Sequence, residues 1–546
     1  MGKKVIIIGG GVAGMTAAHE LAARDGFDVV VYELRDIPGG KARSIRTGAD
    51  GPNGHGLPGE HGFRFFPGFY KHIPDTMRRI PFGDGDTVFE NLTQSTRIEI
   101  ARGGETPALI SPAQFPRSVQ EGELALRASW AYATQLAIPL GEQLHFAELL
   151  CRLLSACEQR RFDEYENESW WDFSGAQQRS AGYQKYLADG LTRTLVAARA
   201  REMSARTGGY ILMQLLQDLA QPGMQVDRVL NAPTNDAWID PWLIHLRDLG
   251  VDYRLCHRVE TVRSDGNQVT AIAGHQVSWP EQVAREAFED EADLYVAAVP
   301  VEVMQTEIDI PLKQSVPELG KLDKLVYRWM NGIVFYLKED VPLVHGHTIF
   351  IDSPWALTAI SQRQFWPSVD FTRLGGGDVG GILSVDISEW ETDGVYAARG
   401  RPAKVCSREV IADEVWAQLK AGLNGPQQVL RDQNRVGWFL DPDIVAPNPK
   451  GADTNLEPLL VNVEGSWSNR PEAGLPEVPN LFLAADYVRT YTDLATMEGA
   501  NEAARRAVNA ILDATNSTAK RCQLWKLHEV GGPFALARAA DNLLYR

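Results

Sequence analysis

The sequence has 546 residues, of which 44% are hydrophobic and 23% charged, a balance typical of folded globular proteins and not of disordered or fibrous ones. Lys and Arg total 54 against 71 Asp and Glu, and the net charge of −17 argues against nucleic acid as a partner. Five scattered cysteines, without a zinc-like spacing, predict a reducing cytoplasmic compartment and no metal site. No run of 18 apolar residues occurs, so no transmembrane span is expected, and a peripheral membrane contact is left open.

The first elements expected are a strand over residues 5–8, a glycine-rich turn, and a helix from Met15 to Ala23. In a G-x-G-x-x-G turn the first glycine permits a tight turn, the second lets the backbone approach a pyrophosphate, and the third lets the helix pack on the strand. The helix N-terminus then faces the phosphate charge. The residues expected to bind a dinucleotide here are Gly9, Gly11, Val12, Ala13 and Gly14.

A second strand is expected over residues 29–32, and it ends at Glu33 and Leu34. Glu33 lies 19 positions after Gly14. An acidic residue at about that distance accepts hydrogen bonds from the ribose hydroxyls of a dinucleotide. We therefore include Glu33 and Leu34 in the predicted cofactor site.

A glycine pair with basic residues follows this strand, and it contains Gly40, Lys41, Ala42 and Arg43. Close backbone approach and neighbouring cations suit a diphosphate. The stretch from Glu33 to Arg43 resembles the FAD-binding signature of the flavin amine oxidase and phytoene desaturase superfamily. The resemblance implies a non-covalent FAD, bound in part by these four residues.

Residues 60–70 combine aromatic and ionisable side chains. They resemble the segment that the phytoene desaturase branch of the superfamily places under the flavin ring, which implies that Phe63 and Arg64 contact the cofactor. We expect His61, Arg64 and Tyr70 to act in catalysis, with Phe66 close to the ring. The alternatives are a hydrogen-bonded core histidine, a salt-bridged arginine and a packed tyrosine.

The resemblance implies an α/β fold with a Rossmann-type FAD-binding domain assembled discontinuously from residues 1–90, 245–305 and 470–515. Two insertions are expected to form a mixed α+β substrate domain. Apolar residues at helical spacing predict a mainly helical region over 91–244, and alternating runs predict a sheet over 306–469. Residues 516–546 are expected to form a tail helix, docked either on the chain itself or on a partner or membrane.

Three later positions complete the predicted FAD site. The run from Tyr253 to Val262 resembles the strand whose valine, here Val259, meets the adenine. Asp486 ends a strand-like run, and in the superfamily this acid lies near the ribityl and phosphate groups. Met497 and Ala500 open a long helix whose N-terminus can stabilise the negative charge of a reduced flavin.

The resemblance to the phytoene desaturase branch implies hydride transfer between flavin N5 and a long apolar polyene, polyketide or isoprenoid. Three directions stay open, namely desaturation, reductive cyclisation as in polycyclic tetramate macrolactam enzymes, and hydroxysqualene dehydroxylase-type chemistry, with NADPH as one electron donor considered. A flavin amine or amino-acid oxidase is the alternative class. An apolar tunnel or plain core are both considered for the tryptophans Trp170, Trp171, Trp238 and Trp242.

Overall fold

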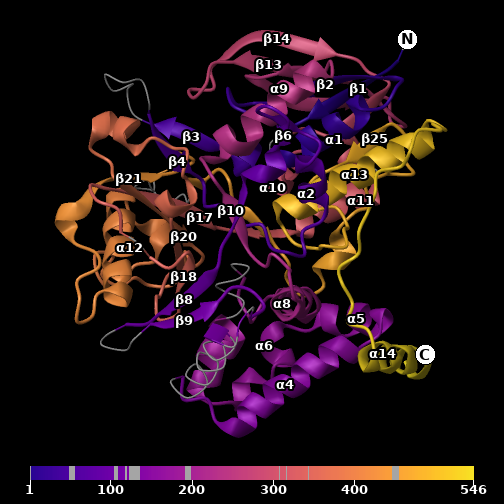
Figure 1. The fold of residues 1–546 in the computed structure, drawn as a ribbon. Coiled ribbons are helices and arrows are strands. Elements are labelled where there is room, and N and C mark those ends of the chain that lie inside the picture. Colours follow the sequence, from indigo (N-terminus) through magenta and orange to yellow (C-terminus); the bar gives the residue numbers. More distant parts are fainter. Residues whose placement is uncertain are drawn as a thin grey trace.

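The computed structural model describes residues 2–47, 56–103, 108–116, 118, 120–121, 136–190, 198–306, 308–314, 316–341, 343–445 and 454–545. Its centre is a parallel five-stranded sheet, in the upper part of Figure 1, built from three distant stretches of the chain. In spatial order its strands are β11 (Asp252–Arg254), β2 (Phe27–Tyr32), β1 (Lys3–Ile8), β15 (Leu294–Ala297) and β25 (Leu481–Leu483). The predicted discontinuous α/β fold is therefore confirmed.

Helices from both ends of the chain cover this sheet. Helix α1 (Val12–Ala22) packs against α13 (Met497–Ala514) and also contacts α9 (Asp240–Asp248). The apolar run of β1 from Val5 to Ile8 is fully buried, as expected for a parallel strand covered by helices. An antiparallel sheet of β12 (His257–Ser264), β13 (Val269–Val277) and β14 (Ala284–Asp290) lies beside it.

A mixed seven-stranded sheet forms the second half of the molecule. Its strands in spatial order are β21 (Arg435–Leu440), β17 (Asn331–Leu337), β20 (Gly381–Ile387), β19 (Leu357–Ser361), β18 (Gly346–Phe350), β8 (Arg97–Ala101) and β9 (Leu109–Pro112). One face packs on α12 (Arg408–Leu423), which begins where Ser407 accepts a hydrogen bond from the backbone N–H of Val410. The expected boundary at residue 91 is wrong for this sheet, because β8 and β9 pair with β18 and not with the helical region.

The lower part of the molecule is helical (Figure 1). It contains α4 (Leu140–Ser155), α5 (Glu158–Asp163), α6 (Trp170–Phe173) and α8 (Ala205–Ala220). Of the region expected to be mainly helical, residues 122–135 and 191–197 lie outside the described part. The four tryptophans considered for a tunnel are all buried in cores, and Trp238 stacks on Trp242 with ring centroids 6.0 Å apart.

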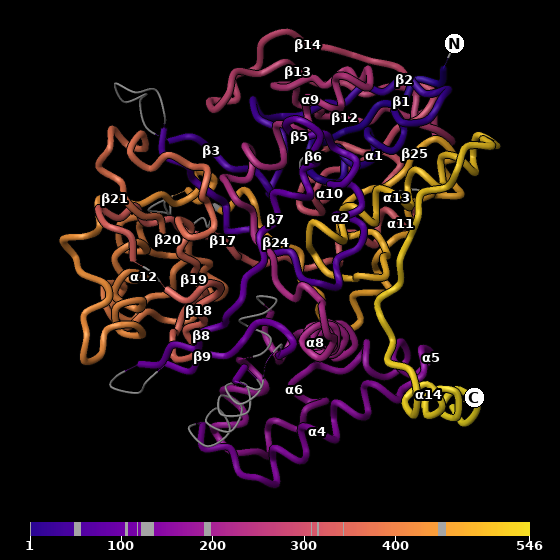
Figure 2. Tube along the Cα trace, viewed as in Figure 1, coloured from indigo at the N-terminus to yellow at the C-terminus, as the bar shows by residue number. Residues whose placement is uncertain are grey.

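The tail after α13 runs down one side of the molecule to α14 (Pro533–Leu544), as the yellow trace in Figure 2 shows. It docks on its own chain. The ring of Trp525 contacts His72, and Asp541 accepts from the backbone N–H of Cys157 at 2.8 Å and pairs with Arg160 at 2.8 Å. Among the described residues of the tail, α14 is the only helix, and residues 520–531 have no regular secondary structure.

The remaining elements connect these parts. They are β3 (Ser44–Thr47), β4 (Leu57–Glu60), α2 (His72–Met77), β5 (Pro81–Phe82), β6 (Asp86–Thr87), β7 (Leu92–Gln94), β10 (Arg228–Leu230), α10 (Val301–Thr306), α11 (Pro317–Lys321), β16 (Val326–Arg328), β22 (Ile444–Val445), β23 (Thr454–Asn455) and β24 (Leu459–Val461). Among the helices of the described residues, none is both long and apolar enough to cross a membrane.

Candidate flavin site

The turn between β1 and α1 has the backbone that a pyrophosphate requires. Gly9 has φ of 102°, and a Cβ on Gly14 would lie 1.9 Å from the carbonyl oxygen of Gly9. A Cβ on Gly11 would meet only Gly40, at 3.7 Å, so the space in front of Gly11 is open. Gly11 is the N-cap of α1 and brings no side chain to the first amides of the helix, which include those of Val12 and Ala13. These amides are therefore free of a side-chain cap, and such helix N-termini bind anions.

Glu33 lies at the end of β2 beside this turn. Its Oε2 accepts from the backbone N–H of Gly10 at 2.7 Å, and its Oε1 accepts from that of Arg35 at 2.9 Å. The start of β12 is tied to the same place, because the backbone N–H of His257 donates to the carbonyl of Glu33 at 2.8 Å. Val259 follows two residues later and is buried, whereas Leu34 is half-buried.

These features fit the adenosine diphosphate half of FAD. The uncapped helix N-terminus and the open space before Gly11 suit the pyrophosphate, and the carboxylate of Glu33 suits the ribose. The chain thus has the donor and acceptor set that FAD needs at this edge of the sheet.

The cations expected beside the diphosphate are already paired with carboxylates. Lys41 lies 2.5 Å from Oε1 of Glu302. Arg43 is fully buried and contacts Asp441 at 3.2 Å, Glu457 at 3.3 Å and also Asp443. Sequence reasoning missed these three acids, which lie about 400 residues after Arg43, because no local pattern marks them.

The expected catalytic His61 belongs to this polar group. Its Nδ1 lies 2.9 Å from Oδ2 of Asp441, and its Nε2 lies 3.1 Å from the amide nitrogen of Asn331. With both ring nitrogens engaged, His61 corresponds to the alternative of a hydrogen-bonded core histidine. A role toward substrate would require one of these bonds to break.

Arg64 connects residues 60–70 to the short helical turn over Gly40–Ala42. Its Nη2 donates to the carbonyl of Lys41 at 2.8 Å, and its Nε donates to that of Ala42 at 3.3 Å. Phe63 and Phe65, on either side of it, are half-buried, whereas Phe66 is fully buried against Trp238. Arg64 therefore anchors an aromatic segment beside Gly40.

Tyr70 lies close to the start of α13, whereas Glu498 serves the fold. Tyr70 shares a hydrogen bond with Thr496, and burial raises the pKa of its phenol above the usual range. Oε1 of Glu498 accepts from the backbone N–H groups of Lys71 and His72 at 2.6 and 2.7 Å, and Oε2 accepts from that of Ile73 at 2.9 Å. Glu498 therefore caps α2, while Met497 and Ala500 on the same turn are half-buried.

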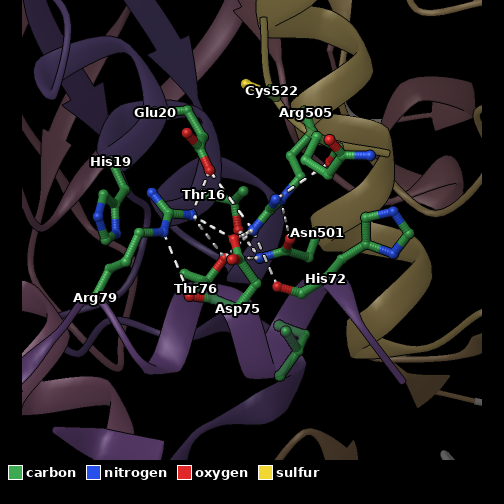
Figure 3. A network of polar contacts seen from close by, with 12 residues as sticks. Thr16, His19, Glu20, His72, Asp75, Thr76, Arg79, Asn501, Arg505 and Cys522 are labelled. Atoms are coloured by element: carbon green, nitrogen blue, oxygen red, sulfur yellow. Dashed lines mark hydrogen bonds and ion pairs between the residues drawn. The ribbon is translucent and has the colours of Figure 1, made fainter. Parts of the chain in front are cut away.

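A buried polar network fastens α1, α2 and α13 together below this turn (Figure 3). The guanidinium of Arg505 contacts Asp75 at 2.6 Å and Thr76 at 2.9 Å, and Asn501 donates to Thr16 at 2.8 Å. Arg79 lies 2.5 Å from Glu20. The network holds the first turn of α13 in a fixed relation to helix α1.

A second group of buried titratable side chains, also missed by sequence reasoning, lies next to residues 60–65. Nδ1 of His347 is 2.7 Å from Oδ2 of Asp227, and the rings of Phe63 and Phe65 lie 5.0 and 5.3 Å from the His347 ring. Although burial alone would lower the pKa of His347, Asp227 raises it above the usual value. Burial also raises the pKa of Asp386 to about 7. The aromatic segment thus lies between the nucleotide turn and an ionisable group on the large sheet.

Asp486 follows β25, as expected, and is half-buried. Its carbonyl accepts from Nη1 of Arg470 at 3.1 Å, and burial raises the pKa of its carboxyl group. The structure thus brings together the nucleotide turn, Lys41 and the carboxyl end of β25, since the charge of Lys41 acts on Asp486.

Comparisons with known proteins agree with this architecture. A putrescine oxidase bound to putrescine has a TM-score of 0.61 at 13% identity, over 94% of this chain and 99% of the other. Cyclohexylamine oxidase from Brevibacterium oxydans IH-35A has a TM-score of 0.59 at 14% identity, over 94% and 100%. A protein described as a protoporphyrinogen oxidase from Exiguobacterium sp. 255-15 has a TM-score of 0.57 at 15% identity, over 94% and 99%. At such identities the likeness shows the fold.

No curated protein matches the chain significantly in sequence. The sequence profile of the family described as flavin containing amine oxidoreductase matches residues 12–512. This match spans nearly the whole chain, from the start of α1 into the last turn of α13. The chain therefore belongs to the flavin-containing amine oxidoreductases, and it is a flavin-dependent oxidoreductase of that superfamily.

Proposed function

We propose that the protein binds FAD non-covalently and oxidises or reduces a long, apolar, conjugated polyene or isoprenoid. Bound FAD supplies hydride exchange at its N5 atom. Gly11, Val12, Ala13 and Glu33 would hold its adenosine diphosphate half. Lys41, Asp486, Met497 and Ala500 would lie toward its other half.

The proposed substrate class rests on the position of Phe63 and Phe65. Arg64 donates to the backbone carbonyls of Lys41 and Ala42 and thereby fixes these half-buried rings beside the turn over Gly40–Ala42. An aromatic wall excludes water and orients an apolar chain without acid–base groups. This aromatic wall supports the polyene class, and so does the resemblance to phytoene desaturases.

Anaerobic visible spectra of the purified protein test the proposal. A yellow protein whose flavin bands bleach with phytoene supports desaturation, and bleaching with NADPH supports a reductive reaction, although the comparisons give NADPH no support. Phe65→Ala should slow bleaching by phytoene about tenfold through loss of positioning. Phe115→Ala is the control, because Phe115 is exposed. A flavin that neither reagent bleaches contradicts the polyene proposal.

Amine oxidation is the second candidate, because Glu60 and Asp386 place buried carboxyl groups near the same segment. Burial raises the pKa of each to about 7, and a cationic amine would favour their charged forms. One structural neighbour is bound to putrescine, so putrescine is the amine used in the test. Bleaching by putrescine with release of hydrogen peroxide in air, and none with phytoene, would favour this reading over the polyene.

A further inference from the structure

Arg470 is fully buried, yet two of its nitrogens have no partner among the described residues. It follows a short 3-10 turn over Ser466–Asn469, and its Nη1 donates to the carbonyl of Asp486 at 3.1 Å and lies 3.2 Å from Oδ1 of Asp493. Within the part of the chain that the structure describes, Nε and Nη2 have no hydrogen-bond partner. A buried donor left unpaired costs about 1–3 kcal/mol, and more when charged. Such a group indicates a missing ligand.

Asn462 contributes an unpaired acceptor next to it. Its amide nitrogen donates to the carbonyl of Asp493 at 2.9 Å and to Oδ1 of Asp493 at 3.1 Å, the same oxygen that Arg470 contacts. The side chain is buried, and among the described residues its Oδ1 has no partner. Asn462 also lines a small, partly charged pocket together with Met203, Trp329, Arg328 and Glu202.

Asp493 fixes both side chains in place. It has φ of 44°, is buried, and also accepts from the hydroxyl of Thr207 at 2.8 Å and pairs with Arg206. One carboxylate therefore holds two guanidinium groups and an amide on a loop three residues before Thr496, the N-cap of α13.

The position of the pair points to the cofactor. Arg470 contacts the carbonyl of Asp486, which follows β25 of the nucleotide-binding sheet, and ligands of open α/β sheets bind outside the carboxyl ends of the strands. The N-terminus of α13 adds positive partial charge at the same place.

The three unpaired atoms narrow the chemical class of the ligand. Arg470 offers two N–H donors and a positive charge, whereas Asn462 offers an acceptor. A phosphate would satisfy only the arginine, since it has no N–H to give to Asn462. The pyrimidine edge of a flavin has both carbonyl acceptors and an N–H donor, so it satisfies both side chains.

We propose that Arg470 and Asn462 bind the pyrimidine edge of the flavin ring and that Arg470 stabilises the negative charge which this edge carries after reduction. The inference rests on the proposed binding of FAD and adds two flavin-binding residues that the sequence motifs do not mark. A cation held beside the ring favours the reduced form and therefore raises the midpoint potential.

The test is the midpoint potential of the FAD-loaded protein, measured against reference dyes. Arg470→Gln should shift the potential downward, while Arg470→Lys, which keeps the charge, should stay near wild type. Arg489→Gln is the matched control, because Arg489 is part-exposed, pairs with Glu472 at 3.5 Å and should leave the potential unchanged. Arg470→Gln protein that holds FAD at the wild-type potential overturns the inference.

A second variant, at Asn462, tests the inference even if Arg470→Gln does not fold. Asn462→Leu removes the acceptor and should weaken FAD binding about tenfold, measured by fluorescence titration of the apoprotein. Unchanged FAD affinity in this variant also overturns the inference. Wild-type protein that binds no flavin contradicts the proposed cofactor itself, so the two failures are distinguishable.

Discussion

Glu33 serves the fold and the predicted cofactor site with one carboxylate. Two backbone N–H groups already bind its two oxygens, and a carboxylate has about four lone-pair sites, so acceptor capacity is left for ribose hydroxyls. Glu33→Ala should weaken FAD affinity about tenfold or more without changing turnover at saturating FAD. A fluorescence titration of the apoprotein measures this. An FAD affinity equal to wild type would remove Glu33 from the ribose site.

Gly11 tests the pyrophosphate site without disturbing the fold. A Cβ there has its nearest contact at 3.7 Å, so Gly11→Val should fold, yet its side chain would occupy the space in front of the helix N-terminus. We expect the purified variant to lose its flavin. Gly103→Val is the control, because a Cβ at Gly103 meets no atom of the described residues within 4 Å and the position lies in the bend after β8, away from this turn. Normal flavin content in Gly11→Val would show that the phosphates bind elsewhere.

The residues of the nucleotide turn were predictable because each acts through its neighbours in sequence. Gly9 needs its positive φ, Gly14 needs contact with Gly9, and Glu33 ends the next strand, all within one local unit. By contrast, Arg43 contacts Asp441 and Glu457, which lie about 400 positions later in the sequence. Asn462 is held by Asp493, which belongs to a separate loop. Since their partners depend on tertiary folding, no spacing in the sequence marks them.

At the level of elements, Glu498 links the start of α13 to α2. Its carboxylate replaces the N-terminal cap that α2 lacks, because Lys71 at the N-cap position provides none. Its Oε1 also lies 2.8 Å from Nδ1 of His72. Glu498→Ala should therefore lower the free energy of unfolding by about 3 kcal/mol, which urea denaturation measures.

Glu409→Ala is the matched control for this change. Glu409 lies in the first turn of α12, where Ser407 already caps the helix, and its side chain is exposed. We expect a much smaller loss of stability there. Equal losses in the two variants would contradict the capping role of Glu498.

Elements with a strong local pattern follow the sequence closely. The predicted strand over 29–32 lies within β2, and the long helix expected to open at Met497 and Ala500 is α13. The pairing of β8 with β18 across some 250 residues was not predictable, because a strand's hydrophobic alternation does not identify its partner. The region expected to be mainly helical therefore contains β8 and β9, two strands of the seven-stranded sheet.

At the scale of the molecule, buried charges join segments that are far apart in the chain. Glu20 on α1 contacts Arg79 at 2.5 Å and Arg24 at 3.0 Å, and Arg505 on α13 lies 3.6 Å away (Figure 3). The backbone of Cys522 in the tail then pairs with Asn509 of α13. Helices α1 and α13, which cover the parallel sheet, are thus held together by ion pairs as well as by apolar packing.

This arrangement predicts how acid affects stability. Although burial raises the pKa of Glu20, Arg79 and Arg505 lower it to about 2, against about 4.5 in the unfolded chain. Because the folded-state pKa is depressed, the stabilisation is present above about pH 4.5 and is lost as the pH falls toward 2. Glu20→Gln should be less stable than wild type by about 3 kcal/mol at pH 6, since it leaves buried guanidinium groups unpaired.

Thermal unfolding of both proteins between pH 6 and pH 2 measures this dependence. The gap in unfolding temperature should narrow below pH 4.5 and nearly close by pH 2, where wild-type Glu20 is itself half protonated. Asp513→Asn is the control, because Asp513 lies on α13 but is exposed, so its gap should stay small at every pH. A gap for Glu20→Gln that stays constant across this range would mean that the ion pairs with Arg79 and Arg505 do not contribute through charge.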